Sequence, residues 1–126
     1  MIIDDQPGVR RLLLEALQQA GFQVSMAANG EEGLRKIIAE KPNLAILDMK
    51  MPGMNGVEFL SELHRRSCLL PVIIISAYED KDLAEQAQKL GARHFLHKPF
   101  DLGTLYRLVN TVLAHNCLEL EAAALV

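Results

Sequence analysis

Five short apolar segments recur along this chain, and each is followed by a longer stretch with a different spacing of apolar residues. The segments cover residues 1–3, 22–26, 44–47, 72–75 and 95–96. Short and continuously apolar segments are typical of parallel strands that helices cover on both faces. Consecutive parallel strands also need a crossover connection between them, which is usually a helix. The alternation therefore predicts an α/β fold.

The stretches between these segments show helical spacing. In the first, apolar side chains recur every three or four positions, at Val9, Leu12, Leu13, Ala16, Leu17 and Ala20. This spacing places them on one face of a helix. We expect further helices over residues 31–40, 57–66 and 80–90, and a last helix that begins after a cap at Asp101.

A strand followed by a helix thus occurs five times, and the chain length of 126 residues suits one domain. Because crossovers between parallel strands are right-handed, five such units wind helices onto both faces of one sheet. The sequence predicts a doubly wound, parallel, five-stranded (βα)5 sheet of the flavodoxin-like type. Its expected strand order is 2-1-3-4-5.

Composition and charge exclude several classes of function. The formal net charge of -3 gives no basic footprint, so we expect no nucleic-acid binding by this chain alone. No apolar run approaches the ~18 residues of a spanning helix, and no signal peptide is visible. Cys68 and Cys117 lack the spacing of metal ligands and are expected to be reduced thiols. These features predict a cytoplasmic protein without membrane contact.

Polar side chains follow four of the five predicted strands. Asp4 and Asp5 follow the first strand, Asp48 the third, Ser76 the fourth and Lys98 the fifth. In a doubly wound sheet, ligands bind beyond the carboxyl ends of the strands where the strand order reverses, here between the first and third strands. Three carboxylates at that place would repel one another unless a cation joins them. Mg²⁺ suits such a site, because it binds carboxylates together with water and phosphate oxygens.

Each of these residues also has a purely structural interpretation. Asp4 and Asp5 could cap the first helix, Ser76 could cap the fourth, and Lys98 could be a solvated surface side chain. Their joint placement favours a balanced site for a phosphoryl group, since three carboxylates, one Mg²⁺ and one lysine sum to zero charge.

Four separate motifs resemble those of response regulator receiver domains. They are Asp4-Asp5, then Leu-Asp-Met-Lys-Met-Pro-Gly-Met-Asn-Gly at 47–56, Ser76-Ala77, and Lys98-Pro99-Phe100. The resemblance covers residues 1–114 and is greatest to single-domain sporulation phosphorelay regulators and to receivers of enhancer-binding activators. Residues 115–126 would then be a tail or the start of a linker. Because only three residues precede Asp4, we also expect the natural start to lie upstream.

The resemblance implies a phosphoryl acceptor of a two-component system. A phosphohistidine on a sensor kinase or a histidine phosphotransfer protein would donate to Asp48. Asp5, Asp48 and the backbone carbonyl of Lys50 would ligate Mg²⁺, with Asp4 acting through a bound water. The chain would catalyse its own phosphorylation and slow dephosphorylation, and it would not be an enzyme in the ordinary sense.

The resemblance also implies a switch. Ser76 would hydrogen-bond the phosphoryl group and Lys98 would pair with it, while Phe95 would be the aromatic residue that rotates. The peptide bond between Lys98 and Pro99 would be cis. The face formed by the fourth helix, fifth strand and fifth helix would change shape and could contact an output domain or a second copy of the chain.

Other functions are less consistent with the residues. A phosphatase with an aspartate nucleophile would need a second aspartate at position 50, where this chain has Lys50. A flavin carrier would need a phosphate-binding loop after the first strand, where Asp4 and Asp5 would repel phosphate. A pseudo-receiver without phosphorylation is disfavoured by the complete set of polar residues. The histidines, His64, His94 and His97 among them, are interpreted as structural or surface groups.

Overall fold

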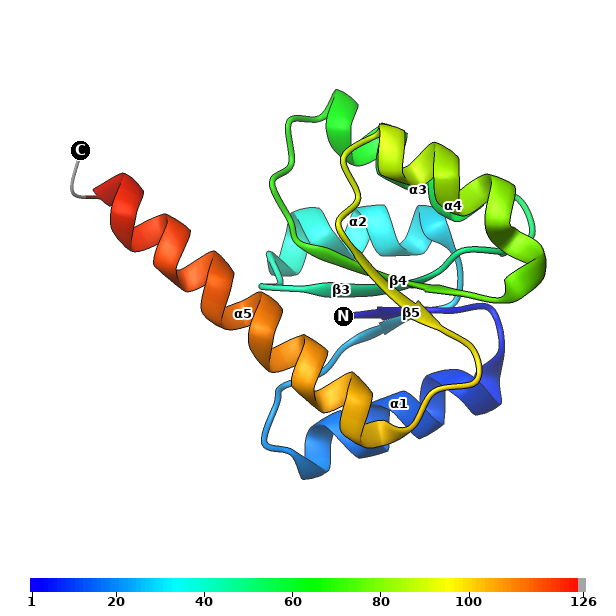
Figure 1. Cartoon of the computed structure of the whole chain (residues 1–126), viewed down its shortest axis with the longest axis horizontal. Coiled ribbons are helices and arrows are strands. Elements are labelled where there is room, and N and C mark those ends of the chain that lie inside the picture. The colour runs from blue at the N-terminus through cyan, green and yellow to red at the C-terminus, as the bar shows by residue number, and fades with distance from the viewer. Residues whose placement is uncertain (125–126) are drawn as a thin grey trace.

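Five parallel strands form a single sheet (Figure 1). The computed structural model describes the backbone of residues 1–124 and the side chains of residues 1–114. The expectations for Cys117 and for side chains of the tail lie outside these described side chains. The strands are β1 (Ile2–Ile3), β2 (Met26–Ala27), β3 (Ala45–Asp48), β4 (Val72–Ser76) and β5 (His94–His97). Their order is β2-β1-β3-β4-β5, which confirms the predicted fold.

Helices cover both faces of the sheet (Figure 1). Helices α1 (Pro7–Gln19) and α5 (Leu102–Ala124) lie on one face. Helices α2 (Gly30–Glu40), α3 (Gly56–Arg65) and α4 (Lys81–Lys89) lie on the other, with a short 3-10 turn, η1 (Tyr78–Asp80), before α4. None of the described helices is both long enough and apolar enough to cross a bilayer.

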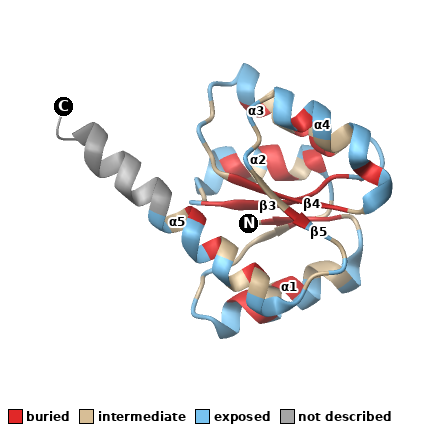
Figure 2. Ribbon diagram, in the orientation of Figure 1, coloured by how far each residue is buried: buried red, intermediate tan, exposed pale blue. Residues whose placement is uncertain are grey.

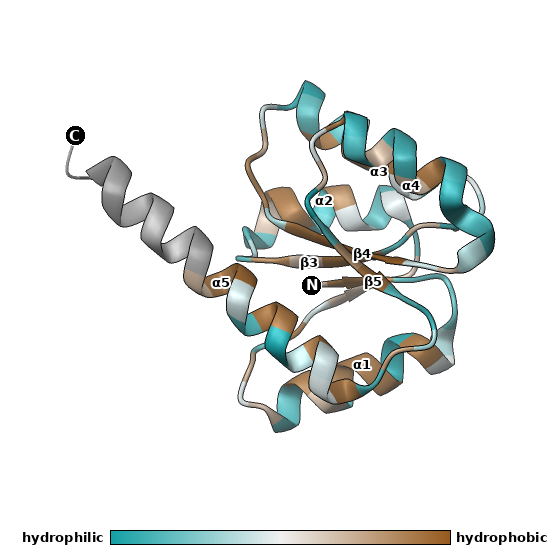
Figure 3. Ribbon diagram, viewed as in Figure 1, coloured by the Kyte–Doolittle hydropathy of each residue, from teal (hydrophilic) through white to brown (hydrophobic). Residues whose placement is uncertain are grey.

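The strands separate two hydrophobic cores. Side chains alternate along each strand, so Ile46, Ile73 and Ile75 pack toward α1 and α5, while Leu47 and Ile74 pack toward α2, α3 and α4. Figure 2 shows β3 and β4 as the most completely buried elements, and Figure 3 shows that they are also among the most hydrophobic. Burial on both faces explains why the strand sequences are continuously apolar rather than alternating.

Strand β2 is shorter than the sequence predicts. Residues 22–26 were expected to form it, but only Met26 and Ala27 do, paired with Ile2 and Ile3 of β1. A strand needs a partner for its backbone groups, and the two residues of β1 offer partners for only two residues of β2.

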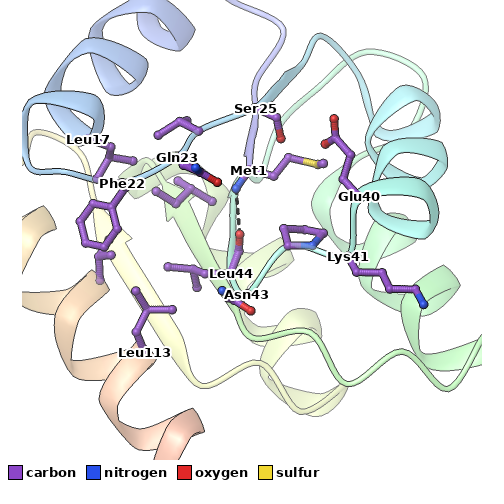
Figure 4. Close-up of a pocket in the computed structure, with 14 residues that line it drawn as sticks. Met1, Leu17, Phe22, Gln23, Ser25, Glu40, Lys41, Asn43, Leu44 and Leu113 are labelled. Atoms are coloured by element: carbon purple, nitrogen blue, oxygen red, sulfur yellow. Dashed lines mark hydrogen bonds between the residues drawn. The ribbon is translucent and has the colours of Figure 1, made fainter.

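A hollow of about 430 Å³ lies at the amino-terminal end of the sheet, beyond the start of β1 (Figure 4). Leu17, Phe22 and Leu113 contribute apolar side chains to it, and the Met1 amine donates a hydrogen bond to the Leu44 carbonyl at 2.9 Å. Burial lowers the pKa of this amine below its usual value. The hollow lies at the opposite end of β1 from the acidic residues and does not form part of the candidate site.

Candidate functional site

Three carboxylates meet where β1 and β3 end. Asp4, Asp5 and Asp48 each place one carboxylate oxygen within 4.8 Å of the others. Strands β1 and β3 are neighbours with Ile3 paired to Leu47, so Asp4 and Asp48 follow paired residues. Asp4 and Asp48 are buried and Asp5 is half-buried. The structure therefore brings together the three carboxylates that the sequence places after these two strands.

Asp4 has an oxygen without a partner. Its Oδ1 accepts a hydrogen bond from the Gln6 N–H at 2.9 Å, and its backbone carbonyl accepts one from Arg10 at 2.7 Å. Its Oδ2 is buried and is the one such side-chain atom without a hydrogen-bond partner among the described residues. Burial raises the pKa of Asp4, and the hydrogen bond from Gln6 opposes that rise. A buried acceptor without a partner, on a carboxylate that lies beside two others, suits a cation.

Asp48 lies between opposing charges. Burial is the largest effect on its pKa and raises it, the nearby Asp4 raises the pKa further, and Lys98 lowers it. The Lys98 Nζ lies 3.6 Å from Asp48 Oδ1, and the lysine side chain is partly exposed. One ammonium against three carboxylates leaves an excess of negative charge, which a divalent cation would balance.

The loop after β3 is fixed by close backbone contacts. The Met49 N–H donates to the Ile75 carbonyl at 3.0 Å, and the Gly56 N–H donates to the Met49 carbonyl at 2.8 Å. A Cβ on Gly56 would lie 2.8 Å from Met49 Sδ and 3.1 Å from its Cα, so this position has no room for a side chain. Lys50 lies in this loop with an exposed side chain. The role of its carbonyl as a metal ligand stays a prediction.

Ser76 and Lys98 are joined through the backbone at the ends of β4 and β5. The Lys98 N–H donates to the Ser76 carbonyl at 2.9 Å, and the Lys98–Pro99 peptide bond is cis. Ser76 is buried and is itself the last residue of β4. The turn η1 that follows is fixed by Asp80, whose Oδ2 accepts from the Ala77 N–H at 2.9 Å. Asp80 is also the residue before α4, but its side chain makes no capping hydrogen bond to that helix, and none from Ser76 is found among the described residues.

Phe95 lies on β5, at the edge of the sheet. It is half-buried and packs against the core on the side of α2, α3 and α4. Its proposed rotation stays a prediction.

Sequence reasoning missed a contact of His97. Its Nδ1 lies 3.3 Å from Ser76 Oγ, whereas the histidines were interpreted as structural or surface groups. The two residues end neighbouring strands and are register partners. The available signal was that Ser76 and His97 each close an apolar strand, so that aligning the two strand ends would have paired them.

Comparisons with known proteins agree with this fold. A family model described as response regulator receiver domain matches residues 1–110. The sporulation initiation phosphotransferase F of Bacillus subtilis is 41% identical over 102 residues, which are 81% of this chain and 82% of that protein. The DNA-binding transcriptional regulator NtrC of Escherichia coli is 36% identical over 114 residues, which are 90% of this chain but only 24% of NtrC. The solved receiver domain of NtrX from Brucella abortus has a TM-score of 0.83 at 28% identity, and the match covers 90% of this chain and 96% of that domain.

Proposed function

Because this chain belongs to the response regulator receiver domain family, we propose that Asp48 is the residue that accepts the phosphoryl group. Members of this family are phosphoryl acceptors of two-component systems rather than classical enzymes. The observation that carries the assignment is the position of Asp48. Its carboxylate lies among Asp4 and Asp5 and is also 3.6 Å from the Lys98 ammonium.

The chemistry follows from these neighbours. An oxygen of Asp48 attacks the phosphorus of a phosphohistidine on a kinase or phosphotransfer protein, and a new P–O bond forms. The P–N bond breaks, and the ring nitrogen of the donor keeps the electron pair. Phosphoryl transfer needs mostly positioning and neutralisation of oxygen charge. The Lys98 ammonium supplies one positive charge, and the Ser76 hydroxyl supplies a hydrogen-bond donor.

The acidic residues fit a magnesium ion. Support comes from the unpartnered Oδ2 of Asp4 and from the three carboxylate oxygens that lie within 4.8 Å of one another. Asp5, Asp48 and the Lys50 carbonyl would ligate the ion directly, and Asp4 would act through a water. When bound, Mg²⁺ would neutralise charge on the phosphoryl oxygens.

Phosphorylation would change the shape of the face formed by α4, β5 and α5, and this face would contact the next protein or domain. Ser76 would turn toward the phosphoryl group and Phe95 would rotate, as a shift between two existing arrangements. A sensor kinase or a phosphotransfer protein is the expected donor. The chain spans about a quarter of NtrC, so an output domain is one candidate partner for this face. A second copy of the chain is the other.

Acetyl phosphate and intact-mass measurement test the assignment. With Mg²⁺, the wild-type chain should gain the mass of one phosphoryl group, and this adduct should slowly disappear as the chain dephosphorylates itself. Asp48→Ala should gain none, while Asp82→Ala, at an exposed position of α4, should behave as the wild type. An adduct that persists in Asp48→Ala, or none in the wild type at any Mg²⁺ concentration, would refute the proposal. Rapid turnover of acetyl phosphate would instead indicate a phosphatase.

A further inference from the structure

A histidine contacts the hydroxyl that the proposed function assigns to the phosphoryl group. Ser76 ends β4 and His97 ends β5, and the two residues are register partners. Paired residues of neighbouring strands project from the same face of a sheet. Here Ser76 Oγ and His97 Nδ1 are 3.3 Å apart. The register of the sheet itself therefore fixes this contact.

The environment of the two side chains sets the direction of the hydrogen bond. Ser76 is 1% exposed, so its hydroxyl hydrogen does not point into water. Among the described residues, the His97 ring is the hydrogen-bond partner of this hydroxyl. A buried donor without an acceptor is costly, whereas the exposed ring can keep its own hydrogen on Nε2, toward solvent. On this ground we assign the hydroxyl as the donor and Nδ1, in the tautomer that carries its hydrogen on Nε2, as the acceptor.

A phosphoryl group on Asp48 would need the same hydrogen. A serine hydroxyl has one hydrogen, and ionised phosphoryl oxygens only accept hydrogen bonds. Ser76 cannot donate to His97 and to a phosphoryl oxygen at the same time. We propose that His97 is a positioning residue that holds the Ser76 hydroxyl in the unphosphorylated arrangement and competes with the phosphoryl group for it. This inference rests on the proposed function of Asp48 and Ser76.

The backbone allows the hydroxyl to turn without moving the strands. The Lys98 N–H donates to the Ser76 carbonyl, so the end of β4 stays attached to β5 when the side-chain bond breaks. Phe95 lies two residues before His97 on β5 and therefore projects from the same face. Release of His97 and rotation of Phe95 would thus occur on one side of the sheet. His97 shifts the equilibrium toward the unphosphorylated arrangement by the net free energy of one hydrogen bond.

Beryllofluoride binding measures this competition at equilibrium. With Mg²⁺, beryllofluoride occupies the place of a phosphoryl group on an aspartate without a covalent P–O bond. His97→Leu should bind it roughly two- to tenfold more tightly than the wild type, which is the net effect of one hydrogen bond. His97→Asn keeps an acceptor near the position of Nδ1 and should restore wild-type affinity. His94→Leu, the same replacement on the opposite face of β5, should leave the affinity unchanged.

A double replacement separates competition from a general structural effect. In a Ser76→Ala background, His97→Leu should no longer alter the affinity, because the contested hydroxyl is gone. Unchanged or weaker binding by His97→Leu overturns the proposal, and so does an equal gain in the Ser76→Ala background. His97→Ala gives the same test if the leucine variant does not fold. If the wild type shows no binding that depends on Asp48, the proposed function fails; if it binds and His97→Leu does not differ, only the role of His97 fails.

Discussion

Replacing Asp48 with asparagine should make the metal-free protein more stable, although it removes the proposed acceptor. The replacement keeps the size of the side chain and removes one of three carboxylates that lie within 4.8 Å of one another. It also removes the attraction between Asp48 and Lys98. The expected result depends on which of these two effects is larger.

The distances between the charged groups show that the repulsion is the larger effect. Two unit charges 4.8 Å apart repel by ~3.5 kcal/mol at an effective dielectric constant of ~20. The Lys98 ammonium at 3.6 Å attracts Asp48 by ~4.6 kcal/mol under the same assumption. Because Asp4 and Asp5 both repel Asp48, repulsion exceeds attraction by ~2 kcal/mol, and solvent around the partly exposed Lys98 weakens the attraction further. The variant should therefore melt roughly 5–10 °C above the wild type.

Magnesium should reverse this difference. A ligand that binds only the folded state stabilises it by about 1.4 kcal/mol at ten times its Kd and by about 2.7 kcal/mol at a hundred times. The wild type should gain this stabilisation. Asp48→Asn should gain much less, because it has lost one of the proposed ligands.

Thermal unfolding followed by circular dichroism, in EDTA and in Mg²⁺, measures both effects. Glu85→Gln removes a carboxylate from an exposed position of α4 and should change the stability by less than about 0.5 kcal/mol in either buffer. A lower melting temperature of Asp48→Asn in EDTA would refute the repulsion argument. An equal Mg²⁺ effect on both proteins would place the cation elsewhere.

Three further outcomes are expected. The stability gap between Asp48→Asn and the wild type in EDTA should shrink as the pH falls, as acid titration of unfolding would show. The reason is that the pKa of Asp48 is raised in the folded state, so that protonation of Asp48 stabilises the folded wild type. This stabilisation is complete below the unfolded-state pKa and is lost as the pH rises through the folded-state pKa. Gly56→Ala should destabilise the protein by about 1–3 kcal/mol in urea unfolding, because its Cβ has no room, whereas Gly8→Ala, with nothing within 4 Å, should be neutral or stabilising. A pair of extended apolar residues joined before Met1 should continue β1 into the hollow at that end of the sheet. This extension should stabilise the folded state by about 1–3 kcal/mol and so raise the melting temperature. A glycine-serine pair of the same length should stabilise the folded state less.

The features predicted correctly depend on the residue pattern within a single segment. The apolar segments and the helical spacing between them gave the five strands and the strand order. The carboxylates followed, because Asp4, Asp5 and Asp48 come directly after strands whose ends meet at the switch in strand order.

The features missed depend on a partner segment. The residues from Phe22 to Met26 have a strand composition, but the strand is set by β1, which offers partners only for Met26 and Ala27. The contact of His97 with Ser76 depends on the register between β4 and β5, which neither strand contains alone. The unpartnered oxygen of Asp4 depends on burial by surrounding elements that its local sequence does not show.

The distribution of the site over the chain has a consequence for synthesis. Asp4, Asp48, Ser76 and Lys98 belong to four different strand-and-helix units, and parallel neighbours are separated along the chain by at least one crossover helix. Contacts between such distant segments cost loop-closure entropy and are slow to form. A nascent chain contains the acceptor carboxylate well before it contains the lysine that faces it. Under the proposed function, a half-made or misfolded copy carries Asp48 but has no reactive site, so phosphorylation reports that the whole domain has folded.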